Sequence, residues 1–218
     1  MPSFSDDASN PKAFVFGPQA TSFDLAAFFK LRTQLQETPR FQWVLNTVVE
    51  LSSDWNNISK SIAKLQDFSG EKLLEQLREW LRGAPIPEGS FPLPNTLLSP
   101  LVVIAQLTQY SAFLASAIPD LNETHELPAI IKTSTETLGM CTGTLSAFVV
   151  ACSSNITDVA HYGGVAVRLA MLTGALVDAE EIARGTEDKS MSFSASWNAD
   201  DSIMKNILKR FSEVNTIL

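Results

Sequence analysis

The apolar residues of this chain form one short extended run and then longer runs with helical spacing. Ala13 to Phe16 is apolar throughout and ends at Gly17-Pro18, which predicts a buried first strand that leads into a loop. Apolar positions then recur every three or four residues from Leu25 to about Leu35, from Phe41 to Leu65 and from Glu71 to Arg82. The first half of the chain is therefore predicted to be one strand followed by a series of helices.

The second half contains the most apolar segment, Leu97 to Ile118, which we predict to be a helix at the centre of the core. The partly β-branched run Thr135 to Leu138 then precedes an apolar stretch of helical character, Thr144 to Ala151. A further helix is predicted from Asp158 to Leu172, and Gly163-Gly164 is expected to weaken its first half.

The last part of the chain predicts one more strand and one more helix. Met191 to Trp197 alternates Met, Phe, Ala and Trp with Ser, which is typical of a half-buried strand. Asn198 precedes an amphipathic pattern that ends near Phe211. The sequence contains no internal repeat, and its 218 residues suit one domain or part of a larger one.

Composition and charge narrow the class of protein. Apolar residues make up 45% of the chain and charged residues 18%, as in a compact globular protein. The net charge of −8 argues against a nucleic-acid partner, because few basic groups are available to displace counterions from phosphates. Residues 1–12 form a polar leader without the features of a signal peptide, and Leu97 to Ile118 is interrupted by polar residues and Pro100. We therefore expect a cytoplasmic protein without a membrane span.

The candidate chemistry lies in Gly139-Met140-Cys141-Thr142-Gly143. A short run, a glycine, one reactive side chain, a second glycine and a helical stretch form the pattern of a nucleophile elbow between a strand and a helix. The glycines suit a turn that is too tight for a Cβ atom beside the strained central residue. At the start of a helix, unpaired amides and the helix dipole favour a thiolate. Cys141 is therefore interpreted as an acyl-accepting nucleophile.

The second cysteine, Cys152, is interpreted as structural. Eleven positions separate it from Cys141, which corresponds to about 16 Å along a helix and exceeds the reach of a disulfide. Both cysteines are therefore expected to be free thiols in a reducing compartment.

Two stretches together resemble one family. Ala13 to Phe29 (AFVFGPQATSFDLAAFF) and Gly139 to Ala147 (GMCTGTLSA) are similar to the starter-unit acyltransferase (SAT) domain at the N-terminus of fungal non-reducing polyketide synthases. Weaker support comes from Ala166 to Ala170 and from Ser196-Trp197. The resemblance covers nearly the whole chain in the same order.

The resemblance implies an α/β fold with a malonyl-acyltransferase-like (α/β-hydrolase-like) large subdomain, rich in helices around a short central sheet. Residues 13–218 would be the N-terminal part of that subdomain. The family moves an acyl starter unit from acyl-CoA, or from a fatty acid synthase, through a cysteine thioester to the acyl carrier protein of its own polyketide synthase. The resemblance implies neither a bound cofactor nor a metal, since acyl-CoA and the phosphopantetheine-linked acyl group are substrates.

The resemblance also assigns roles to individual residues. Cys141 would carry the acyl group, while the amide of Thr142 and the neighbourhood of Gln19 would form the oxyanion hole. General chemistry agrees, because a tetrahedral intermediate needs hydrogen-bond donors directed at its oxyanion. Malonyl-type relatives pair the malonyl carboxylate with an arginine that aligns near Thr173 here, while Arg168 aligns with an arginine of more structural character. Thr173 and Arg168 are candidates for the substrate pocket, and the missing arginine favours a neutral acyl group such as acetyl or hexanoyl.

The histidine base of the family is expected far downstream, after a ferredoxin-like subdomain. The chain is therefore interpreted as truncated before that subdomain. Its two histidines, His125 and His161, do not match the family position. Two other functions remain open at this stage: a thioesterase-like hydrolase that uses the same elbow with His161 as base, and a non-catalytic interaction module that lacks the base.

Overall fold

The computed structural model of the chain describes residues 12–18, 25–85, 93–117, 127 and 135–184, all of which belong to one compact unit, residues 1–185. Among them lie two strands, one short 3-10 helix and seven α-helices. In chain order these are β1 (Lys12–Phe16), α1 (Leu25–Glu37), η1 (Pro39–Phe41), α2 (Gln42–Ser61), α3 (Ala63–Gln66), α4 (Gly70–Leu81), α5 (Asn95–Ala117), β2 (Thr135–Gly139), α7 (Gly143–Cys152) and α8 (Ile156–Ala183). The strand and helix expected after residue 190 lie outside the described residues.

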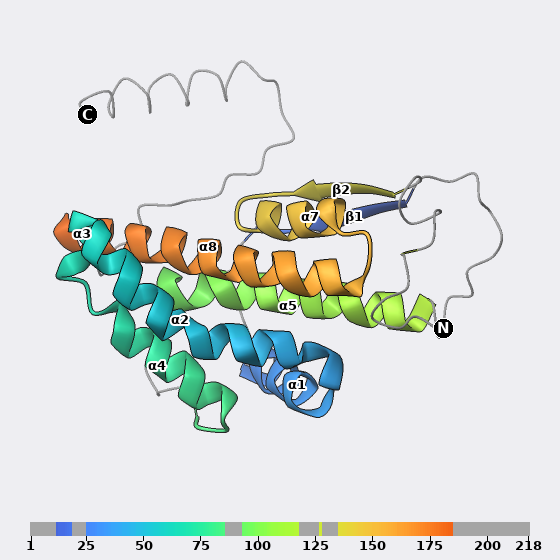
Figure 1. Ribbon diagram of the computed structural model, residues 1–218, viewed down its shortest axis with the longest axis horizontal. Helices are drawn as coiled ribbons and strands as arrows, with labels where there is room; N and C mark the ends of the chain where they lie inside the picture. Colours follow the sequence, from blue (N-terminus) through green and yellow to red (C-terminus); the bar gives the residue numbers. More distant parts are fainter. Residues whose placement is uncertain (1–11, 19–24, 86–92, 118–126, 128–134, 185–218) are drawn as a thin grey trace, which may run out of the picture. The chain divides into compact units, whose positions relative to one another are not determined.

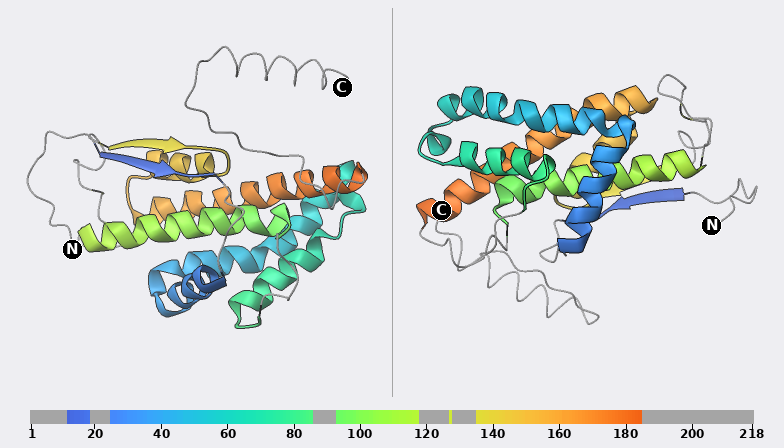
Figure 2. Two further views of the ribbon diagram at one scale, coloured as in Figure 1. Left: turned by 180° about the vertical axis from the view of Figure 1, so that it is seen from behind. Right: turned by 90° about the horizontal axis from the view of Figure 1, so that it is seen from below.

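The helices form layers on one side of a small sheet. The long helices α5 and α8 run side by side, as Figures 1 and 2 show. On one side of this pair lie α2 and α4, and on the other side lie α7 and the two strands (Figure 1). The α/β architecture with a short sheet and many helices agrees with the expectation from the sequence.

The predicted central helix is the centre of the core. In α5 the side chains of Val103, Leu107 and Leu114 are fully buried, and Pro100 lies inside the helix. The carboxylate of Asp178 on α8 caps the start of α5: it accepts hydrogen bonds from the amides of Asn95 (2.9 Å) and Thr96 (2.7 Å). This buried carboxylate satisfies amides that a helix start leaves unpaired.

Helix α8 is longer than predicted. It continues to Ala183 instead of ending near Leu172, and its glycines do not weaken it. A Cβ atom on Gly163 would lie 2.7 Å from the ring of Trp43, and one on Gly164 would lie 3.2 Å from the hydroxyl of Thr47. The small residues therefore let α2 approach α8 closely, and the packing gained there offsets the low helix propensity of glycine.

The two strands pair in parallel, with Phe16 opposite Gly139 at their carboxyl ends. Within the described part of the chain, only one face of this sheet is covered. Phe14 lies edge-on against Tyr110 and Phe113 of α5, at ring distances of 5.1 and 5.2 Å. Val15 points the other way and is 64% exposed, because successive residues of a strand face opposite sides. The expectation of a fully buried first strand is therefore wrong, and the strand also begins one residue earlier, within the predicted leader.

Two helices, residues 95–116 of α5 and the whole of α8, are long and apolar enough to cross a membrane by length and composition alone. The expectation that no segment approaches a membrane span is therefore not met by this measure. In the most apolar window of α5, however, 72% of the residues are buried inside the protein. The core helix of a globular protein passes the same test, so the finding is weak evidence for a membrane segment.

Candidate active site

The predicted elbow is present between β2 and α7. The strand ends at Gly139, and the amide of Met140 still donates to the carbonyl of Phe16 on β1 at 3.0 Å. The chain then reverses at Cys141, whose φ of 54° makes it the only non-glycine residue with positive φ in the described part of the chain. For a residue with a Cβ atom this left-handed conformation costs about 1–2 kcal/mol. Such strain at the central residue is the mark of a nucleophile elbow.

Both flanking glycines are required by close backbone contacts. A Cβ atom on Gly139 would lie 2.4 Å from the α-carbon of Thr144 in the first turn of α7. A Cβ atom on Gly143 would lie 2.3 Å from the carbonyl oxygen of Phe16 and 2.4 Å from that of Gly17. The helix start is thus pressed against the carboxyl end of both strands, which confirms the physical reason given for the glycine spacing.

The start of α7 presents a backbone amide beside the cysteine. The amides of Gly143, Thr144 and Leu145 donate to the carbonyls three residues earlier, at 3.0 to 3.1 Å. For the amide of Thr142, in contrast, no partner is found among the described residues. The hydroxyl of Thr144 donates to the carbonyl of Gly139 at 3.3 Å and ties the helix back to the strand. The amide of Thr142 thus lies beside Cys141 at the start of α7, and its assignment to an oxyanion hole stays a prediction.

Both thiols are free and exposed. The sulfur of Cys141 has the hydroxyl of Thr142 as a neighbour at 3.8 Å. Cys152 is the last residue of α7, and its exposure shows that it does not fill the core. Cys141 differs from Cys152 in standing at the amino end of the helix, where the dipole favours negative charge.

Two hydrogen bonds that the sequence did not indicate link the loop after β1 to the elbow helix, and both are made by one side chain. The side-chain amide of Gln106 on α5 donates to the carbonyl of Gly17 at 2.9 Å. Its oxygen accepts a hydrogen bond from the hydroxyl of Ser146 on α7 at 2.6 Å. Gln19, two residues after Gly17, lies outside the described residues. A lone glutamine in an apolar helix pattern carries no signal that would have revealed this link.

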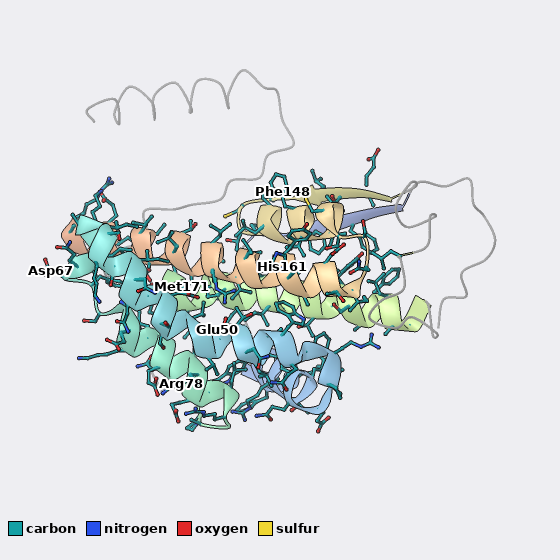
Figure 3. The ribbon with its side chains drawn as sticks, in the orientation of Figure 1. Glu50, Asp67, Arg78, Phe148, His161 and Met171 are labelled. Carbon is teal, nitrogen blue, oxygen red and sulfur yellow. The ribbon has the colours of Figure 1, made fainter. Side chains whose placement is uncertain are left out.

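The candidate pocket residues lie along α8. Arg168 is bound by α2: its Nε donates to Asp54 at 2.7 Å, and one terminal nitrogen pairs with Glu50, which is labelled in Figure 3. Its other terminal nitrogen donates to the carbonyl of Gly164 at 3.1 Å. Thr173 is exposed on the same helix. Arg168 thus holds α8 against α2.

Among the described residues, no hydrogen bond joins a histidine to Cys141. His161 is exposed on α8 (Figure 3), and its ring lies 5.2 Å from that of Tyr162. His125 lies outside the described residues. A hollow between α1, α2 and α4 is lined by apolar side chains together with Gln36, Arg78 and Arg82, and none of its lining residues belongs to the elbow.

A strained cysteine between a parallel strand and a helix, flanked by two sterically required glycines, defines a protein of the nucleophile-elbow class. The family described as "Starter unit:ACP transacylase in aflatoxin biosynthesis" (SAT) matches residues 87–218, which is more than half of the chain. The chain belongs to this SAT family.

Relatives over most of the chain are fungal polyketide synthases. The citrinin polyketide synthase of Monascus ruber is 56% identical over 188 residues, which cover 86% of this chain and 7% of that protein. The clavatol synthase claF of Penicillium crustosum is 48% identical over 215 residues, which cover 98% of this chain and 8% of that protein. The non-reducing polyketide synthase AC of Didymella fabae is 43% identical over 187 residues, covering 86% and 7%. The chain thus spans only 7 or 8% of the length of these relatives.

Proposed function

We propose that this chain loads the starter unit of a non-reducing polyketide synthase: Cys141 takes an acyl group from acyl-CoA, or from the carrier protein of a fatty acid synthase, and passes it to the acyl carrier protein of the synthase. The observation that carries the proposal is Cys141 itself, exposed at a φ of 54° at the amino end of α7. The membership in the SAT family supports the same reaction.

The chemistry is an exchange between thioesters. The Cys141 thiolate attacks the carbonyl carbon of the donor thioester, a new C–S bond forms, and the bond to the coenzyme A sulfur breaks. The phosphopantetheine thiolate of the carrier protein then attacks the cysteinyl thioester and releases Cys141. Both steps pass through a tetrahedral oxyanion. One proposed donor is the amide of Thr142, for which the described residues offer no hydrogen-bond partner, and the neighbourhood of Gln19 is proposed to supply the other.

A neutral acyl group is the proposed substrate. A malonyl group would bring a carboxylate into the pocket, where it needs a cationic partner. The guanidinium of Arg168 is already engaged by Asp54 and Glu50, and the position proposed for the clamping arginine is occupied by Thr173. Acetyl and hexanoyl groups need no such partner.

The test is a transfer assay with the phosphopantetheinylated carrier protein of the same synthase. The chain is mixed with hexanoyl-CoA, acetyl-CoA or malonyl-CoA, and the acylated carrier protein is measured by intact mass. We expect the chain to transfer the neutral acyl groups. Cys152→Ala should retain this activity, and Cys141→Ala should lose it. Equal transfer by Cys141→Ala would contradict the role of this cysteine, and efficient malonyl transfer would contradict the proposed substrate class.

A further inference from the structure

We infer that Gln106 is a positioning residue for acyl transfer, which sets the direction of the loop after β1 relative to Cys141; the inference rests on the function proposed above. Gln106 lies on α5 and belongs neither to the elbow motif nor to the strand before the loop. Its side chain nevertheless contacts both parts of the site, through Gly17 on one side and Ser146 on the other.

The hydrogen bonds fix which way the amide points. The carbonyl of Gly17 can only accept, so it requires the NH₂ group of Gln106, at 2.9 Å. The amide oxygen is then left for the hydroxyl of Ser146, at 2.6 Å. Ser146 is fully buried and lies on the helix that starts immediately after Cys141. A side chain with a donor at one end and an acceptor at the other is therefore needed at position 106.

The loop gains a restraint at Gly17, because the hydrogen bond from Gln106 holds the backbone of a glycine. A Cβ atom at Gly17 would meet no other atom within 4 Å, so its glycine is not imposed by a close contact. Glycine leaves the backbone more freedom than any other residue. The carbonyl of Gly17 is also in contact with the elbow, since a Cβ atom on Gly143 would lie 2.4 Å from it. Fixing this carbonyl fixes the carboxyl end of β1 against the start of α7.

The link made by Gln106 matters for the transition state of acyl transfer. The two proposed donors of the oxyanion hole come from different segments, Thr142 from the elbow and the neighbourhood of Gln19 from the loop after β1. Their mutual placement must hold within a fraction of an ångström for the oxyanion to be stabilised. Gln106 links these two segments through hydrogen bonds, so its loss should slow acyl transfer without removing any group that touches the substrate.

The test compares two reactions of Cys141 in the full chain. Acylation by hexanoyl-CoA passes through an oxyanion, whereas alkylation by iodoacetamide does not. The nearly isosteric variant Gln106→Glu keeps an acceptor for Ser146 but loses the donor to Gly17 at neutral pH. We expect acylation of Cys141 to fall roughly ten- to a hundredfold, while its alkylation stays unchanged. The matched control is Gln109→Glu, the same substitution at an exposed position of α5, which should leave both reactions unchanged.

A pH series separates positioning from a general loss of structure. A protonated carboxyl group can donate to the Gly17 carbonyl, so acylation by Gln106→Glu, expressed relative to the parent at each pH, should recover as the pH falls toward about 5. Neither described hydrogen-bond partner of the side chain, Gly17 or Ser146, carries a charge. A misfolded variant would not recover in this way.

Cys152 supplies an internal reference, because it is an exposed thiol in the same chain. If the parent acylates Cys141 no faster than Cys152, the proposed function fails. If the parent prefers Cys141 and Gln106→Glu retains this preference at neutral pH, the function stands and the positioning role of Gln106 is wrong. The positioning role is also wrong if acylation and alkylation fall together and low pH does not restore acylation.

Discussion

Gly143 at the start of α7 lies so close to Phe16 at the end of β1 that a Cβ atom would come within 2.3 Å of the Phe16 carbonyl oxygen. The carbonyl of Phe16 also accepts a hydrogen bond from the amide of Met140. Phe16 therefore joins β1 both to the end of β2 and to the start of the elbow helix. The glycine of the motif is thus a requirement of backbone packing at the site.

This contact predicts the effect of a single methyl group. We expect Gly143→Ala to lower the free energy of unfolding by about 1–3 kcal/mol, because the backbone of β1 must move to accommodate it. Gly17→Ala is the matched control, since a Cβ atom there meets nothing within 4 Å. Urea unfolding of the two variants provides the measurement. Equal stability of Gly143→Ala and Gly17→Ala would contradict the packing described for the elbow.

In an ordinary helix, a glycine variant is less stable than an alanine variant. The positive φ of Cys141 predicts the reverse order at this position. Glycine adopts a φ of 54° without penalty, whereas alanine has the Cβ atom that makes this conformation strained. We therefore expect Cys141→Gly to be more stable than Cys141→Ala by about 1 kcal/mol. Thermal unfolding of both variants, neither of which carries the thiol, measures the strain independently of chemistry. A more stable alanine variant would place residue 141 in a right-handed helical conformation instead.

The ionisation of Tyr110 makes the free energy of unfolding depend on pH in the alkaline range. Burial raises the pKa of Tyr110 to about 12 from its ordinary value of 10.0. Because the phenol must stay neutral in the folded protein, the stability it contributes is complete below pH 10 and is lost as the pH rises toward 12. For its hydroxyl no hydrogen-bond partner is found in the described part of the chain.

The variant Tyr110→Phe tests the effect of this buried hydroxyl on stability. It keeps the ring that packs against Phe14 and removes a buried hydroxyl, so we expect stability at neutral pH to be unchanged or higher by about 1 kcal/mol. The loss of stability between pH 10 and 12 should become smaller in the variant than in the parent. Denaturant unfolding at a series of pH values measures both effects. An identical alkaline loss in Tyr110→Phe would show that other groups cause it.

Local sequence patterns are sufficient to predict the elbow. Gly139, Cys141 and Gly143 stand close together in the chain, and the physical reason for their spacing is a single turn. The main helices are predictable for a similar reason, since α4 has its own apolar stripe and α5 is a long, mostly apolar run. Gly83 follows the C-cap Arg82 of α4 and has a φ of 114°, a conformation that glycine adopts freely.

What the sequence does not reveal depends on contacts between distant segments. The exposure of Val15 follows from having only one covered face on the two described strands, and no local pattern reports that. The close approach of α2 to α8 depends on Gly163 lying against Trp43. Gln106 and Asp178 acquire their roles only when α5 meets α7 and α8. The contacts of Gly163, Gln106 and Asp178 all involve a partner more than thirty residues away.

The most direct test of the central claim is to locate the acyl group on the chain. After incubation with hexanoyl-CoA, the protein is digested and the two cysteine-containing peptides are compared by mass spectrometry. We predict a hexanoyl thioester on Cys141 at a large excess over Cys152, removed when the phosphopantetheinylated carrier protein is added. Equal labelling of the two exposed thiols, or an adduct on Cys141 that the carrier protein cannot remove, would contradict the role proposed for Cys141.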